Sequence, residues 1–116
     1  MARQPCTAEE CTLCLEAYIA IRDSKGSFSV SNPVLISLRN YLEQEGVASR
    51  SIDSVTLRII NFRYQDTGTG CSGISNTALS VWKKYLDESG EKIDTRRLRT
   101  DCEAIRASIR VRRNEQ

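Results

Sequence analysis

Apolar residues recur at steps of three and four residues along nearly the whole chain, and this spacing predicts helices rather than strands. The clearest case lies near the C-terminal end, where the residues at 98, 102, 105 and 109 are Leu, Cys, Ile and Ile. Residues at these steps lie on one side of an α-helix and form a stripe that packs against a core. An extended conformation is expected only for the short run at 28–30. The sequence therefore predicts an all-α fold.

Start and stop signals divide this pattern into about five helices. Side chains typical of helix N-caps precede four of the apolar stripes, at Thr7, Asn32, Ser51 and Ser75, and the fifth helix is expected to begin near Asp94. The predicted helices end near Arg22, at Gly46, before the Gly-rich loop at 65–75, at Gly90, and in the C-terminal tail. A chain of 116 residues is long enough for one modest core. We therefore expect residues 1–116 to form one compact helical bundle.

Charge is distributed unevenly along the chain. The formal net charge is +2, but it is −2 over residues 1–49, +1 over 50–89 and +3 over 90–116. Within the predicted C-terminal helix at 92–113, the positive charge comes mainly from seven arginines: Arg96, Arg97, Arg99, Arg106, Arg110, Arg112 and Arg113. Guanidinium groups suit phosphate and carboxylate alike. The cluster is therefore either a phosphate-binding surface or a solvated helix face with ion pairs.

No segment of the sequence resembles a membrane span or a secretory signal. No apolar run approaches the ~20 residues that a spanning helix needs, and no apolar stretch follows the first residues as in a signal peptide. We expect a cytoplasmic protein that does not enter a membrane.

The sequence contains no histidine. This excludes imidazole as a general base, as a metal ligand and as a member of a nucleophilic triad. The carboxylates are not paired in a pattern that suggests a site. We therefore expect a protein that is not an enzyme and that has no catalytic residues.

Five cysteines raise the alternative of a metal site. Cys6, Cys11 and Cys14 have the spacing C-x4-C-x2-C, which also occurs in plant-type ferredoxin clusters. However, Cys11 and Cys14 lie on the apolar stripe of a predicted helix, where buried free thiols behave as small apolar groups. We therefore expect no cofactor and no metal, with Cys71 as the exposed, reactive thiol.

The segment from Pro33 to Phe62 predicts two helices joined by a turn, which is the outline of a helix-turn-helix. In that motif the second helix enters the major groove, and its first turn meets bases and phosphates. The predicted nucleic-acid-binding residues are Arg50, Ser51, Ser54, Arg58, Asn61 and Arg63, joined by Arg96, Arg97 and Arg99 of the last helix. The N-terminus of the helix that Ser75 begins could also hold a phosphate, although a simple connector is the commoner role of such a loop.

The run from Arg50 to Phe62 resembles a signature, R-S-x-x-S-V-x-x-(K/R)-(L/I)-x-N-F, in the N-terminal accessory domain of HNH-type restriction endonucleases, including modification-dependent ones. The resemblance extends over residues 8–87, through short matches at 9–18, 32–34, 73–76 and 81–82. In those enzymes the chemistry lies in a separate C-terminal HNH domain, which this sequence lacks. The resemblance therefore implies an accessory module that helps to engage DNA.

Two functions remain open at this stage. The first is a non-catalytic DNA-binding module, for instance a regulator or a component of phage defence or counter-defence. The second is a protein-interaction module, such as a phage-encoded inhibitor that docks on a nuclease, which the near-neutral net charge fits equally well.

Overall fold

The computed structural model describes residues 6–69 and 73–115 and confirms the all-α bundle. Its helices are α1 (Ala8–Asp23), α2 (Pro33–Gln44), α3 (Ile52–Thr67), α4 (Asn76–Lys84) and α5 (Thr95–Asn114). The four predicted N-caps occur in the structure, and Asp94 caps α5. Each of the five cap side chains accepts a backbone N–H of the first helical turn. The connection between α2 and α3 spans 45–51.

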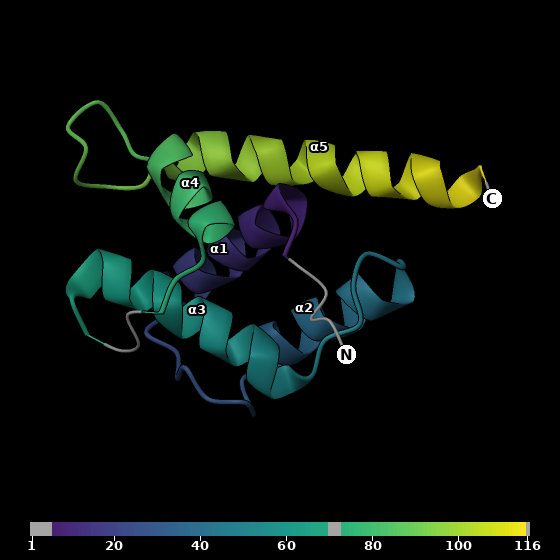
Figure 1. The fold of residues 1–116 in the computed structure, drawn as a ribbon, viewed down its shortest axis with the longest axis horizontal. Helices are drawn as coiled ribbons and strands as arrows, with labels where there is room; N and C mark the ends of the chain where they lie inside the picture. The colour runs from purple at the N-terminus through teal and green to yellow at the C-terminus, as the bar shows by residue number, and fades with distance from the viewer. Residues whose placement is uncertain (1–5, 70–72, 116) are drawn as a thin grey trace.

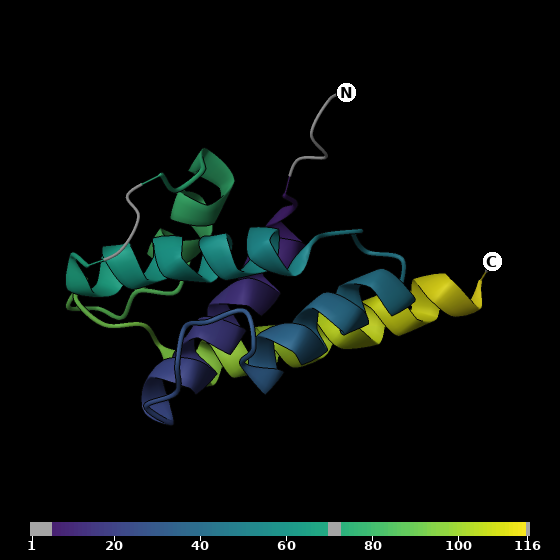
Figure 2. The same cartoon turned by 90° about the horizontal axis from the view of Figure 1, so that it is seen from below.

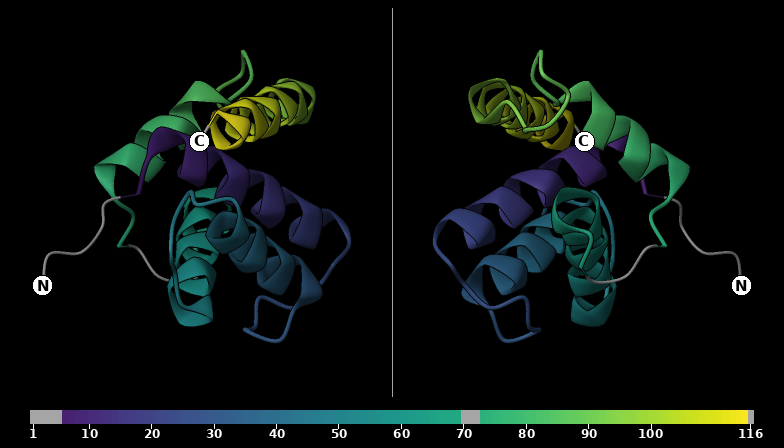
Figure 3. Two further views of the ribbon diagram at one scale, coloured as in Figure 1. Left: turned by 90° about the vertical axis from the view of Figure 1, so that its right-hand side faces the viewer. Right: turned by 90° about the vertical axis from the view of Figure 1, so that its left-hand side faces the viewer.

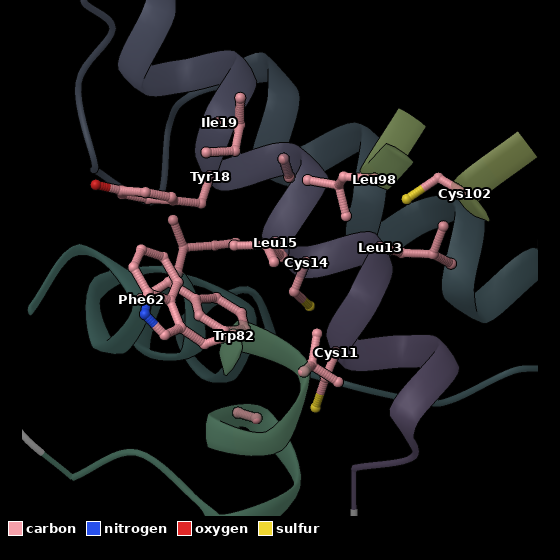
Figure 4. Close-up of a cluster of buried hydrophobic side chains, with 14 of the residues drawn as sticks. Cys11, Leu13, Cys14, Leu15, Tyr18, Ile19, Phe62, Trp82, Leu98 and Cys102 are labelled. Carbon is pink, nitrogen blue, oxygen red and sulfur yellow. The ribbon is translucent and has the colours of Figure 1, made fainter. Parts of the chain in front are cut away.

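Helix α1 is the centre of the bundle and packs against each of the other four helices. α3 and α5 lie on opposite sides of it (Figures 1 and 2). Most of its side chains are buried, from Glu10 through Leu15 and again at Ala17–Ile19. The core includes Phe62 of α3 stacked on Trp82 of α4, with ring centroids 6.3 Å apart, next to the apolar side chains of α1 (Figure 4).

Helix α3 is longer than the sequence predicts, since it continues through Thr67 instead of ending before Gln65. The reason is a tertiary contact. Asp66 in its last turn accepts a 2.6 Å hydrogen bond from the Tyr18 hydroxyl and lies 3.3 Å from the Arg22 guanidinium. The helix then ends at Gly68, which has a left-handed φ of 76°.

Helix α4 is shorter than predicted, and the expectation that it ends at Gly90 is wrong. It ends at Lys84, because the backbone after it pairs with the segment leading into α5. Leu86 and Ile93 form an antiparallel bridge, and the N–H of Asp94 donates to the carbonyl of Tyr85 at 2.7 Å. This pairing buries Ile93 and turns the chain from α4 into α5.

Within the described residues, no helix is both long enough and apolar enough to cross a membrane.

Candidate nucleic-acid interface

A concavity of about 770 Å³ lies between the first half of α3 and the start of α4. We call it the α3–α4 concavity. Its polar lining comes from the segment 49–61 on one side and from 73–77 on the other. Five of the nine predicted binding residues line it, namely Arg50, Ser51, Ser54, Arg58 and Asn61.

Two helix N-termini face this concavity, because the caps Ser51 of α3 and Ser75 of α4 both line it. The Ser51 hydroxyl accepts the N–H of Ser54 at 3.1 Å, and the Ser75 hydroxyl accepts that of Ala78 at 3.2 Å. The first two N–H groups of a helix have no intrahelical acceptor and carry the positive end of the helix dipole. The concavity is thus flanked by two partial positive charges of the backbone.

Arg50 and Arg58 form a buried cluster with Glu10 of α1, and we call these three residues the Glu10 triad. Arg50 contacts both carboxylate oxygens at 3.0 Å, through Nε and Nη2, and Arg58 Nη1 contacts Oε2 at 2.7 Å. The Glu10 side chain is 1% exposed, against 10% for Arg50 and 18% for Arg58. The hydrogen bonds to Glu10 raise the pKa of Arg50 above its usual value.

The Glu10 triad gives the two arginines a structural role at the edge of the concavity. It joins the start of α3 to α1 through contacts between residues 40 and 48 positions apart. Its formal charge is +1, since two guanidinium groups share one carboxylate. Both arginines still line the concavity, but moving either guanidinium group away breaks its hydrogen bonds to the buried Glu10 carboxylate.

Most remaining residues of the signature run also support the fold. Val55 and Phe62 are fully buried. Asn61 donates through Nδ2 to the carbonyl of Gly73 at 3.3 Å and thereby joins α3 to the segment before α4. Its Oδ1 is buried and has no hydrogen-bond partner within residues 6–69 and 73–115.

The other four predicted residues lie outside the concavity. Arg63 stacks over the Phe28 ring at 5.1 Å, and Arg97 stacks over the Tyr85 ring at 5.4 Å while donating to the carbonyl of Lys84. Arg96 and Arg99 are exposed on the first turns of α5. The structure therefore separates the arginines of α5 from those of α3.

Sequence reasoning missed two features of this site. One is the organising role of Glu10, which has the sequence features of an ordinary acidic residue in a first helical turn. The other is Thr77, which lines the concavity from α4. Thr77 could have been predicted from the sequence, because its hydroxyl follows closely after the helix cap Ser75. No feature of the neighbouring sequence indicates the role of Glu10.

The described cysteines do not form a metal centre. Cys11, Cys14 and Cys102 are fully buried within the core. No group of three or more potential ligands among cysteine, aspartate, glutamate and histidine occurs in the described part of the chain. Burial raises the pKa of Cys102 to about 12 and also raises that of Cys14. Cys71, expected to be exposed, lies outside the described residues.

In comparisons with known proteins, no family model matches the chain, and no curated protein or solved structure shows significant similarity to it.

Proposed function

We propose that this chain is a non-catalytic DNA-binding module that holds backbone phosphates in the α3–α4 concavity. The observation that supports this most directly is the convergence of two helix N-termini and two arginines on one concave surface. The resemblance to the accessory domain of HNH-type restriction endonucleases points to the same ligand. The absence of histidine is consistent with a module that binds without cleaving.

The chemistry of the concavity suits a phosphate diester. Free N–H groups at helix starts bind anions because the helix dipole adds to their hydrogen bonds. The hydroxyls of Ser54 and Thr77 supply further donors, and the Glu10 triad contributes a surplus positive charge beside them. Asp53 also lines the concavity and opposes an anion, so Asp53→Asn should tighten binding.

The expected binding is electrostatic and therefore depends on salt. Two or three phosphate contacts predict that affinity for duplex DNA falls about 10- to 40-fold between ~50 and ~200 mM salt. Fluorescence polarisation of a labelled duplex across that range measures this slope. Parallel duplexes with and without modified cytosine test whether the base is read as well as the backbone.

The sharpest test introduces a negative charge into the concavity at a position where it does not disturb the fold. Ser54→Glu puts a carboxylate at the third position after the cap Ser51, where glutamate completes a capping box and favours the helix. We expect this variant to fold normally and to bind DNA at least about tenfold more weakly, because a nearby like charge repels phosphate. Ser80→Glu on the exposed side of α4 changes the net charge equally, outside the concavity, and should bind as the parent protein does.

Absence of binding at low salt would contradict the proposal outright. Equal weakening by Ser54→Glu and Ser80→Glu would contradict its location, since only the total charge would then matter. Circular dichroism of both variants establishes that the helices are retained.

A further inference from the structure

A second concave surface lies on another side of the molecule, between α2 and α5, and we call it the α2–α5 groove. Its volume is about 520 Å³, within the ~300–1,000 Å³ typical of ligand sites. α2 and α5 pack mainly against α1 rather than against one another, and α1 lies between them (Figure 3). The floor of the groove includes Ala17 and Ala20 of α1, whose small side chains leave the space between the walls open.

The inside of the groove is mainly apolar. Val34 and Leu38 of α2 form one wall, and Leu98 of α5 contributes to the other. Val34 and Leu38 pack on the core but remain partly exposed. The groove residues of α5 span positions 95–106, which corresponds to ~17 Å of helix. That length corresponds to about three turns of an amphipathic helix lying along the groove.

Two arginines of α5, Arg99 and Arg106, line the groove together with the acidic Glu16 and Asp23 of α1. The spacing of Arg99, Arg106, Arg110 and Arg113 places them on one side of α5. Arg106 pairs with Glu16 at 2.7 Å, and Arg113 pairs with Glu45 at the end of α2. Arg99 and Arg110 are exposed, and within the described residues neither forms an ion pair. Arg99 in the groove, and Arg110 about one helical turn beyond its α5 end, therefore have positive charge left for a partner.

We propose that the α2–α5 groove binds an amphipathic helix of a partner protein. Its apolar stripe enters the groove, and its acidic flank meets Arg99 and Arg110. Charge complementarity selects an acidic partner, because the groove carboxylates Glu16 and Asp23 are already paired with Arg106 and Arg22, whereas Arg99 forms no ion pair within the described residues. This surface is separate from the α3–α4 concavity, so the module can hold a protein and DNA together.

A displayed library of helical peptides tests the proposal without knowledge of the partner. Each peptide has about 12 residues, with leucine fixed at the positions of one helix face and the remaining positions randomised. We expect selection on the full chain to enrich Asp and Glu on one flank. A selected peptide, labelled with fluorescein, should then bind the chain in solution with an affinity that falls as salt rises.

Two pairs of variants locate the bound peptide. Ala20→Leu fills the floor at an exposed position and should weaken binding at least about tenfold, whereas Ala104→Leu on an exposed face of α5 should not. Arg99→Glu should weaken binding of the acidic peptide by a similar factor, whereas Arg96→Glu, outside the groove, should have little effect. Ser54→Glu should leave peptide binding unchanged, which separates this proposal from DNA binding.

Several results would overturn the inference. These are a selection that yields no binders, binders enriched in Lys or Arg, or peptide binding that Ala20→Leu does not affect. Sedimentation equilibrium adds a further outcome. A dimer that dissociates on Ala20→Leu would show that a second copy of the chain occupies the groove instead.

Discussion

Replacement of Glu10 by glutamine is the most informative single perturbation of this fold. The substitution keeps the shape of the side chain but removes the charge that two arginines share. The carboxylate is 1% exposed and accepts hydrogen bonds from both guanidinium groups. Removing one partner of a buried ionic cluster costs about 3–5 kcal/mol. Both arginines keep some contact with water, and glutamine can still accept a hydrogen bond. We therefore expect a loss of stability at the lower end of this range, about 3 kcal/mol.

Such a loss is large for a domain of this size. Small domains are stable by about 5–15 kcal/mol, and 1 kcal/mol corresponds to roughly 4 °C in Tm here. Glu10→Gln should therefore lower Tm by about 12 °C. Urea unfolding followed by circular dichroism and by the fluorescence of the buried Trp82 measures the change in free energy. Glu9→Gln is the matched control, since its ion pair with Arg112 is exposed and worth under about 1 kcal/mol.

A second variant separates the cost of broken pairing from loss of packing. When all three members of the Glu10 triad are replaced by apolar residues, as in Glu10→Leu/Arg50→Met/Arg58→Met, no buried charge remains without its partner. We expect stability within about 1 kcal/mol of the parent protein, because apolar replacement of a buried ionic cluster is often neutral or favourable. Two results would refute the reasoning: a loss of less than about 1 kcal/mol in the free energy of unfolding for Glu10→Gln, or a triple variant that is less stable than the Glu10→Gln variant.

Three further predictions concern the rest of the fold. Gly68→Ala should lower the free energy of unfolding by about 1 kcal/mol, measured by urea titration, because φ is 76° and no atom lies near the added Cβ. Cys11, Cys14 and Cys102 should react with a thiol reagent only after urea unfolding; fast labelling of any of them in native buffer would contradict their burial. Burial and the hydrogen bond to the Asp101 carboxylate raise the pKa of Tyr85 from 10.0 to about 12. The protonated hydroxyl therefore contributes its full stabilisation of the fold below pH 10, and this stabilisation is lost as the pH rises from 10 to 12. Spectroscopic titration of tyrosinate in the folded protein, compared with Tyr85→Phe, checks this.

The sequence predicts those parts of the fold that depend on local chemistry. A cap such as Ser51 acts within its own helical turn, so its identity and position suffice to mark the start of α3. The end of α3 depends instead on Asp66 meeting Tyr18 and Arg22, 48 and 44 residues away. The end of α4 depends in the same way on backbone pairing between Leu86 and Ile93. These contacts exist only after the chain has folded, and apolar spacing gives no sign of them.

The candidate site, too, is predicted from the sequence only in its local features. Residue types and helical spacing bring Arg50, Ser54 and Arg58 to one surface, and the sequence predicts that much. It does not predict that Glu10 engages both arginines, because the pairing crosses from α1 to α3. Spacing also gives no indication of the α2–α5 groove, which depends on how far apart two helices are held by a third.

The signature run therefore carries information mainly about structure. Ser51 caps α3, Val55 and Phe62 fill the core, and Arg50 and Arg58 neutralise Glu10. A protein that shares this run is expected to share the helical scaffold, whatever it binds, because each of these residues has a structural role. Under the two proposals above, specificity depends on positions that the scaffold leaves free, such as Ser54 in the concavity and Ala20 in the groove. Variants at those two positions test function without disturbing the residues that hold the helices together.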